Sequence, residues 1–147
     1  MPNVQQIHAT AVAIDGRGVL LLGESAAGKS DLALRLIDRG ARLIADDRVD
    51  LARQGTSVML SAPSRLAGLL EIRGVGIVRV EPLADVPLAL AVRLVPQQSV
   101  ERLPDVATHE FLGLAVPVVA LDPFELSAPI KIEWALARAV SPAEIVS

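Results

Sequence analysis

The sequence predicts an α/β protein with a central mixed sheet, and three observations support this fold class. Its 147 residues suit a single domain, and 52% of them are hydrophobic, so the chain can form a substantial core. Several short apolar runs are nearly continuous, which is typical of strands buried on both faces of a sheet. One of these runs leads through a glycine-rich loop into an amphipathic helix, as in an α/β unit.

The first half of the chain follows this order closely. Residues 7–14 are expected to form a strand, Asp15-Gly16 a turn and residues 18–22 a second strand. Residues 30–39 form the predicted helix, because their apolar side chains recur at helical spacing. Gly40 can take the left-handed conformation that ends a helix.

The second half is predicted to contain short strands and loops, because seven prolines occur from Pro82 to Pro129. Residues 66–72 fit a helix or a strand equally well. The other expected elements are a strand at 42–45, a hairpin of 49–53 and 57–61, strands at 77–80, 88–95, 108–112 and 116–121, and a closing helix at 132–140.

Composition excludes several classes of protein. Aromatic residues are 2% of the chain and the net charge is −3, which argues against base-stacking or strongly basic nucleic-acid binders. The chain has no cysteine, so disulfides and thiolate metal sites are excluded. The longest apolar run, residues 111–121, is too short to cross a bilayer, and the N-terminus lacks the pattern of an export signal. We therefore expect a cytoplasmic protein without membrane or nucleic-acid partners.

The segment GESAAGKS at residues 23–30 matches the phosphate-binding pattern G-x-x-x-x-G-K-[ST]. Backbone N–H groups of such a loop converge on phosphate oxygens, and the following helix points its positive end at the same anion. In this chemistry the lysine reaches the outer phosphates and the hydroxyl binds Mg²⁺. The alternative is a fortuitous glycine-rich turn. The predicted ATP-binding residues are Gly23, Glu24, Ser25, Ala26, Ala27, Gly28, Lys29 and Ser30.

Asp46 and Asp47 directly follow the apolar strand at 42–45. Carboxylates at the end of such a strand lie where open α/β sheets bind ligands. Both acids would lie beside the phosphate loop if this strand neighbours residues 18–22. The alternative is an ordinary turn or helix cap, in which aspartate makes local hydrogen bonds.

Other polar residues carry weaker signals when taken alone. Glu71 interrupts an apolar stretch, and Gly74 and Gly76 permit an unusual turn, but a strand with one outward-facing glutamate explains them equally well. His8 lies in the first expected strand, where a lone histidine is more often structural. Arg102 has the pattern of a solvated loop residue.

Taken together, these runs resemble the catalytic domain of HPr kinase/phosphorylase, the bacterial enzyme that phosphorylates a serine of the phosphocarrier HPr. The resemblance extends from His8 to about Glu133 and rests on four runs: His8, GESAAGKS, LIADDRVD at 43–50 and LEIRGVGI at 70–77. The last two runs are specific to this family. The resemblance implies a P-loop kinase domain of the HPr kinase and PEP carboxykinase-like type.

The resemblance also implies roles for single residues. The loop at 23–30 would hold the phosphates of ATP, and Ser30 and Glu71 would bind Mg²⁺. Asp47 would be the base that takes the serine proton, and Asp46 would support the metal or Asp47. The catalytic residues implied by the resemblance are His8, near the transferred phosphoryl group, Lys29, Asp47 and Arg102.

The sequence departs from the family pattern at three places. The N-terminal regulatory domain usual in the family is absent, so residues 1–147 are expected to form one catalytic domain. Ala26 replaces a loop glycine, and the P-x-K-x-G-R-N segment is reduced to residues 129–133. That segment is linked in the family to dephosphorylation, so phosphorolysis of the phosphorylated serine stays open, as does the family's hexamer.

The sequence thus predicts an ATP- and Mg²⁺-dependent protein-serine kinase that acts on HPr or a related phosphocarrier. Two alternatives stay open. One is a P-loop kinase of a small molecule with the same architecture. The other is a non-catalytic nucleotide-binding regulator, which would have no need of the set formed by Lys29, Asp47 and Glu71.

Overall fold

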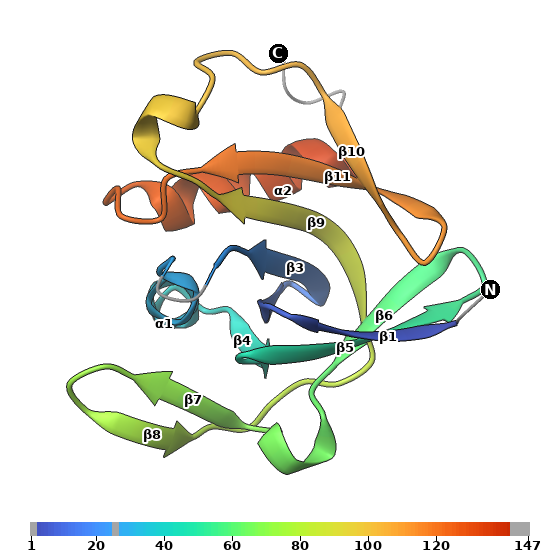
Figure 1. Ribbon diagram of the computed structural model, residues 1–147, viewed down its shortest axis with the longest axis vertical. Helices are drawn as coiled ribbons and strands as arrows, with labels where there is room; N and C mark the ends of the chain where they lie inside the picture. The colour runs from blue at the N-terminus through green and yellow to red at the C-terminus, as the bar shows by residue number, and fades with distance from the viewer. Residues whose placement is uncertain (1–2, 25–26, 142–147) are drawn as a thin grey trace.

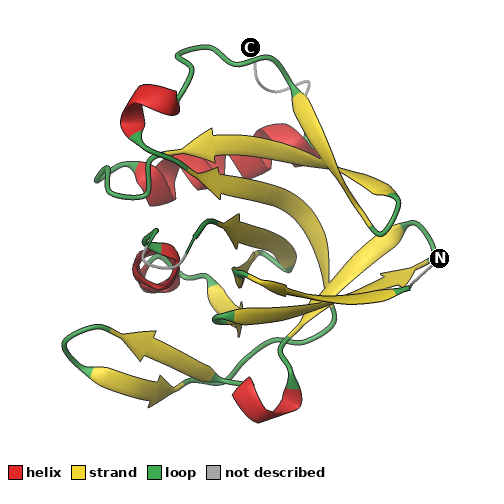
Figure 2. Ribbon diagram, in the orientation of Figure 1, coloured by secondary structure: helices red, strands yellow, loops and turns green. Residues whose placement is uncertain are grey.

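Strands outweigh helices in the molecule, as the short apolar runs predict (Figure 2). The computed structural model describes residues 3–24 and 27–141, so Ser25 and Ala26 of the GESAAGKS loop lie outside the described residues. Two α-helices, α1 (Lys29–Asp38) and α2 (Ala128–Val140), and two short 3-10 helices, η1 (Ser64–Leu66) and η2 (Gln97–Ser99), accompany the strands.

The main sheet has nine strands in the order β1-β5-β6-β9-β3-β2-β4, and β11 pairs with both β9 and β10. Its strands are β1 (Val4–His8), β2 (Thr10–Ile14), β3 (Arg17–Leu22), β4 (Arg42–Ala45), β5 (Arg48–Gln54), β6 (Ser57–Ser61), β9 (Val86–Leu94), β10 (Ala107–Phe111) and β11 (Leu114–Leu121). A separate hairpin of β7 (Leu69–Ile72) and β8 (Gly76–Arg79) stands apart from this sheet in Figure 1. Because β3, β9 and β11 pair in parallel and the other neighbours are antiparallel, the expected mixed sheet is confirmed.

Strand direction decides which residues meet at the edge where the site lies. β3, β9 and β11 run in parallel, so their carboxyl ends meet at one edge. β2 is antiparallel to both β3 and β4, so β4 runs in the same direction as β3. The start of β2 therefore lies at the edge where β3 and β4 end, and residues on either side of Ala9 reach that edge.

Two hydrophobic clusters cover the two faces of the sheet. On one face, Val19 and Leu21 of β3 pack in a cluster with Leu32 of α1 and Ile132 of α2. Leu20 points the opposite way, as alternation along a strand requires, and packs in the second cluster with apolar residues of β5 and β6. Each fully buried leucine of this kind contributes about 1.5–3 kcal/mol. The sheet curls so that β1, β5 and β6 cross beneath β9 in Figure 1.

Three expectations about elements need correction or completion. Residues 7–14 form two strands rather than one, because the chain changes partners at Ala9, from β5 to β3 and β4. The ambiguous stretch at 66–72 is the end of η1 followed by strand β7. The closing helix begins at Ala128 rather than at residue 132, since Pro129 lies in the first turn, where a missing N–H is tolerated.

The remaining expected elements are confirmed. Helix α1 ends before Gly40, whose φ of 107° is the left-handed conformation expected of a helix stop. The hairpin around residues 54–56 is formed by β5 and β6.

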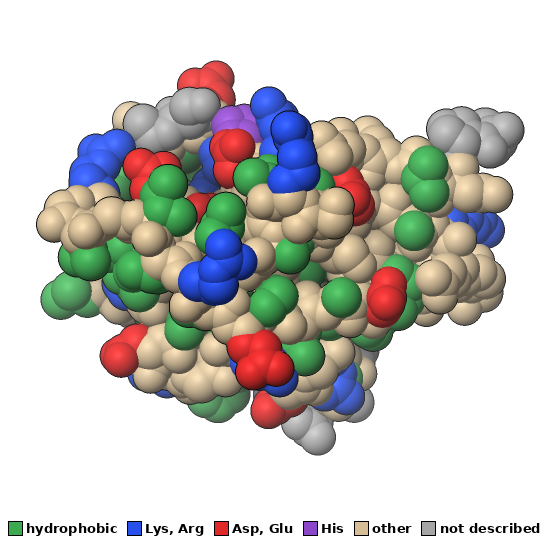
Figure 3. All heavy atoms as spheres, turned by 90° about the horizontal axis from the view of Figure 1, so that it is seen from below, with side chains coloured by type: hydrophobic (Ala, Val, Ile, Leu, Met, Phe, Trp, Pro, Cys, Tyr) green, Lys and Arg blue, Asp and Glu red, His purple; other side chains and the backbone are tan. Residues whose placement is uncertain are grey.

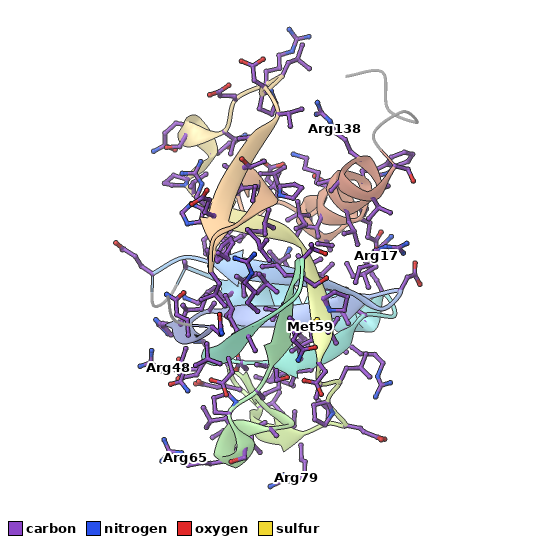
Figure 4. The ribbon with its side chains drawn as sticks, turned by 90° about the vertical axis from the view of Figure 1, so that its right-hand side faces the viewer. Arg17, Arg48, Met59, Arg65, Arg79 and Arg138 are labelled. Carbon is purple, nitrogen blue, oxygen red and sulfur yellow. The ribbon has the colours of Figure 1, made fainter. Side chains whose placement is uncertain are left out.

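Figure 4 shows the molecule from the side, with several arginines labelled. Arg65 and Arg79 lie at the end formed by η1 and the β7–β8 hairpin, and Arg138 lies on α2 toward the opposite end.

Candidate active site

The loop after β3 leads directly into helix α1, and Gly28 makes the transition. Its φ of 92° is one that residues with a side chain rarely adopt. A Cβ added there would also lie 3.2 Å from Cε1 of Phe124, so the ring of Phe124 closes over this position. The Gly28 carbonyl accepts the first helical hydrogen bond, from Leu32 N at 3.0 Å. The positive φ favours glycine at position 28, and a side chain there would also have to displace the exposed ring of Phe124 slightly.

Lys29 is held inside the loop that precedes it. Its side chain is only 7% exposed, and Nζ donates to the carbonyl oxygens of Gly23 at 2.6 Å and Glu24 at 2.8 Å. Burial lowers the pKa of Lys29 from its usual value, while the carboxylates of Asp47 and Asp46 act in the opposite direction. The ammonium group thus lies in a poorly solvated position between the loop and the two acids.

Asp46 joins four segments of the chain through its carboxylate. It is 7% exposed, and Oδ1 accepts hydrogen bonds from Thr10 Oγ1 at 3.0 Å and Ser30 Oγ at 2.7 Å. Oδ2 accepts from the backbone N–H of Glu71 at 3.2 Å. A buried carboxylate is stable only when hydrogen-bonded or paired, and these three donors satisfy that requirement. Asp46 thereby fixes β7 and the start of α1 against β2 and β4.

Asp47 differs sharply from its neighbour. Its φ of 72° puts it in the left-handed region, which aspartate tolerates better than most residues. Its side chain is 66% exposed, and Oδ1 lies 2.9 Å from Nε2 of His8. Arg48 N donates to the Asp46 carbonyl at 2.9 Å within the same tight turn. The acids therefore lie in a turn, as one of the two alternatives predicted, and this turn lines the cleft, which leaves the ligand-site alternative open.

These residues surround one cleft of about 550 Å³. It lies between the start of α1, the turn after β4 and the β7–β8 hairpin, which stand next to each other in Figure 1. Glu71 is exposed and lines the cleft from β7, so its charge in an apolar run does not require burial. The lining residues used below are His8, Thr10, Lys29, Ser30, Asp46, Asp47, Glu71 and Phe124.

The cleft contains oxygen donors suited to Mg²⁺. Ser30, Asp46 and Glu71 present a hydroxyl and two carboxylates, the hard ligands this ion prefers. Within residues 3–24 and 27–141 no cluster of three or more His, Cys, Asp or Glu side chains is arranged to hold a metal by itself. A magnesium ion bound to nucleotide phosphates takes few protein ligands and keeps several waters, so this donor set fits it.

The structure brings most of the expected site residues together. His8, Gly28, Lys29, Ser30, Asp46, Asp47 and Glu71 all line the cleft. Arg102 does not: it lies in the exposed segment between η2 and β10. Its role in catalysis stays a prediction that the described geometry does not support.

Thr10 and Phe124 are among the cleft residues that were not singled out in the sequence. Thr10 is completely buried and holds Asp46, and its only signal was a hydroxyl two positions after His8. Phe124 is 71% exposed and touches the phosphate-loop sequence at Gly28. An exposed aromatic residue in a chain with so few aromatics was a signal that could have been used.

The fold and the cleft define an α/β protein in which a strand–loop–helix segment with the phosphate-loop sequence faces a pair of acids. Residues 1–123 match the family model described as the HPr Serine kinase C-terminal domain. The chain belongs to this family, which confirms the resemblance found in the sequence.

Several relatives have been named individually. The chain is 40% identical over 139 residues to the HPr kinase/phosphorylase of Lactiplantibacillus plantarum, covering 86% of this chain and 42% of the relative. It is 36% identical over 135 residues to that of Chlorobium phaeobacteroides, covering 80% of this chain and 38% of the relative. The chain thus spans about two-fifths of the length of these curated relatives.

A solved structure supports the same relationship. The HPr(Ser) kinase/phosphatase from Coxiella burnetii superposes with a TM-score of 0.83 and 31% sequence identity, over 96% of this chain and 99% of that one. The likeness confirms the expected fold class. In the part of the chain that the structure describes, no helix has the length and apolar character needed to span a membrane.

Proposed function

We propose that the chain is an ATP- and Mg²⁺-dependent protein-serine kinase that phosphorylates HPr or a related phosphocarrier. The observation that carries this proposal is the contact between Asp47 and His8 at a cleft that also contains Lys29 and Ser30. A nucleotide-binding regulator has no need of an exposed carboxylate oriented by a histidine. The names and the fold of the relatives favour a protein acceptor over a small molecule.

The proposed reaction assigns one task to each group. The acceptor serine oxygen attacks the terminal phosphorus of ATP, and the bond between that phosphorus and the bridging oxygen breaks, releasing ADP. Asp47 takes the proton of the serine hydroxyl, and His8 keeps its carboxylate oriented. Lys29 places positive charge beside the outer phosphates.

Magnesium would be held by Ser30 and Glu71, with Asp46 orienting the Ser30 hydroxyl. When bound, it would neutralise charge on the phosphates and fix their orientation. Asp46 is engaged by three donors and 7% exposed, so it is poorly suited to accept the serine proton. The division of roles between the two acids follows from this difference in burial.

The test is transfer of labelled phosphate from ATP to purified phosphocarriers. We expect label on HPr or a relative of it, and none on the same carrier with the acceptor serine replaced by alanine. Lys29→Ala, checked for folding by its thermal transition, should give no transfer. Consumption of ATP only in the presence of small hydroxylated metabolites, with no labelled carrier, would contradict the protein-kinase assignment.

The names of the relatives include a phosphorylase, and the same groups suit the reverse direction. Inorganic phosphate would attack the phosphorus of phosphoserine, and the serine oxygen would leave as Asp47 returns the proton, giving pyrophosphate. Incubating the phosphorylated carrier with phosphate and measuring pyrophosphate tests this second activity separately.

A further inference from the structure

A second, larger cleft opens on the other side of the loop that follows β3. Its volume is about 850 Å³, and Gly23, Glu24 and Ala27 of the phosphate-loop sequence form part of its wall. The rest comes from the ends of β3 and β9 and from the segments that follow β9 and β11. The residues used here are Leu94, Pro96, Gln97, Gln98, Pro123 and Phe124.

Strand order separates the two clefts. β2 and β4 lie on one side of β3, and the acid turn after β4 lines the first cleft. β9 and β11 lie on the other side of β3, and the segments after them line the second. A ligand held by the loop between them would therefore have one end at the acids and the other in the second cleft.

Phe124 lines both clefts and is held firmly although it is 71% exposed. Its backbone N–H donates to Asp122 Oδ1 at 2.9 Å. Arg35 of α1 donates to the carbonyl oxygens on either side of it, those of Pro123 and Glu125. These bonds fix the backbone of the loop, so an exposed aromatic ring carried on it is a ready contact surface, because little loop freedom is lost on binding.

The geometry points to the second cleft as the binding site for the nucleoside part of ATP, with Phe124 as the surface on which the base stacks. This inference rests on the proposed function, because it takes the loop to hold the phosphates. Asp47 must reach the terminal phosphate, so the nucleoside extends away from the acids, past Gly23 and Ala27.

The chemistry of the second cleft suits a flat, partly polar ring. Leu94, Pro96 and Pro123 supply apolar wall, and the face of Phe124 can stack against a base. Gln97 and Gln98 supply amide groups that both donate and accept hydrogen bonds, as the ring nitrogens of a base require. Small-molecule sites commonly combine mostly apolar walls with a few polar groups in this way.

The test compares ATP with tripolyphosphate, which has the phosphates without the nucleoside, by calorimetry on the full chain with Mg²⁺. We expect the wild type to bind ATP more tightly than tripolyphosphate. Phe124→Ala should weaken ATP binding by about 10-fold, the range of a lost stacking contact, and leave tripolyphosphate binding unchanged. Phe124→Trp, which restores an aromatic face, should recover ATP affinity. Leu126→Ala is the matched control, because Leu126 lies in the same loop, is 95% exposed and lines neither cleft.

Three other results of these binding measurements would each contradict a particular claim. Equal affinity of the wild type for ATP and tripolyphosphate would exclude a nucleoside site here while leaving the phosphate loop intact. Unchanged ATP binding by Phe124→Ala, with a raised KM for the protein acceptor, would move Phe124 to the acceptor site and overturn the inference. No binding of either ligand would refute the proposed function, and with it the nucleoside site.

Discussion

Replacing each of the adjacent acids by asparagine should separate stability from catalysis. Asp46→Asn and Asp47→Asn remove the same charge at consecutive positions. Asp46 is buried and accepts three hydrogen bonds, whereas the Asp47 side chain is 66% exposed and, within residues 3–24 and 27–141, hydrogen-bonds only to the side chain of His8. We expect the first change to reduce mainly the free energy of unfolding and the second mainly the rate of transfer.

The magnitudes follow from the contacts. An asparagine at position 46 must either place its NH₂ group against the Glu71 N–H or turn it toward the hydroxyls of Thr10 and Ser30. A hydrogen bond to a charged acceptor is worth about 1.5–3 kcal/mol, so we expect a loss of about 2 kcal/mol. In a domain of this size that lowers Tm by roughly 4–8 °C.

Asp47→Asn should cost less than about 1 kcal/mol, because exposed ion pairs contribute little. Asparagine also tolerates the φ of 72° at this position, so no backbone strain is added. Loss of general-base assistance should instead reduce kcat by about 10²- to 10⁴-fold. ATP affinity should change little, since the loop is untouched.

The assay is urea unfolding, kcat for phosphate transfer and the Kd for ATP, measured side by side. Asp50→Asn is the charge control, because Asp50 accepts a hydrogen bond from Gln6 on the neighbouring strand and does not line the cleft. Near-normal transfer by Asp47→Asn would exclude it as the base. A larger loss of stability for Asp47→Asn than for Asp46→Asn would contradict the claim that the three hydrogen bonds to Asp46 stabilise the fold.

Three further predictions concern the loop and the metal. Burial lowers the pKa of Lys29 in the folded chain below its usual 10.5, so at a pH between the folded and the unfolded pKa the unfolded chain binds more protons. Urea unfolding should therefore show the wild type gaining stability relative to Lys29→Met as the pH rises from the folded pKa toward 10.5. A stability difference that does not change with pH would refute this prediction. Glu71→Gln should raise the Mg²⁺ concentration needed for half-maximal transfer while leaving Tm nearly unchanged; an unaltered requirement makes Glu71 structural. Gly28→Ala, which meets a φ of 92° and the ring of Phe124, should destabilise the fold by at least about 1 kcal/mol and weaken ATP binding, measured by melting and calorimetry.

Local signals explain what could be predicted from the sequence. GESAAGKS lies between an apolar run and a helical pattern, and all three features are within a few residues of one another. The hairpin of β5 and β6 likewise needed only two alternating runs and a short turn. The family-specific runs around Asp46 and Glu71 then identified residues whose chemistry is not apparent from local pattern alone.

What could not be predicted depends on pairing between distant segments. Residues 7–14 carry no sign that the chain leaves β5 at Ala9 and enters between β3 and β4. Thr10 lies beside Asp46, and Phe124 lies beside Gly28, so each joins the cleft through a neighbour from a distant part of the chain. Arg102 was carried over by resemblance alone, and the exposed segment that holds it lies away from the cleft.

The insertion of β2 between β3 and β4 sets a fixed separation between the phosphate-loop sequence and the acid turn. Neighbouring strands lie about 4.8 Å apart, so two strand spacings put β4 about 10 Å from β3. Backbone hydrogen bonds, not side-chain volume, determine this interval. Substitutions in helices α1 and α2 can therefore change the packing against the sheet without changing the distance between β3 and β4. The β2–β4 pairing shifts register between Ala11 and Val12, and an irregularity of this kind changes the local bend and twist of the strand rather than the spacing between strands. Figure 3 shows charged side chains of both signs interspersed with hydrophobic ones on one face of the molecule, and surface positions of this kind can vary without changing the spacing between the strands.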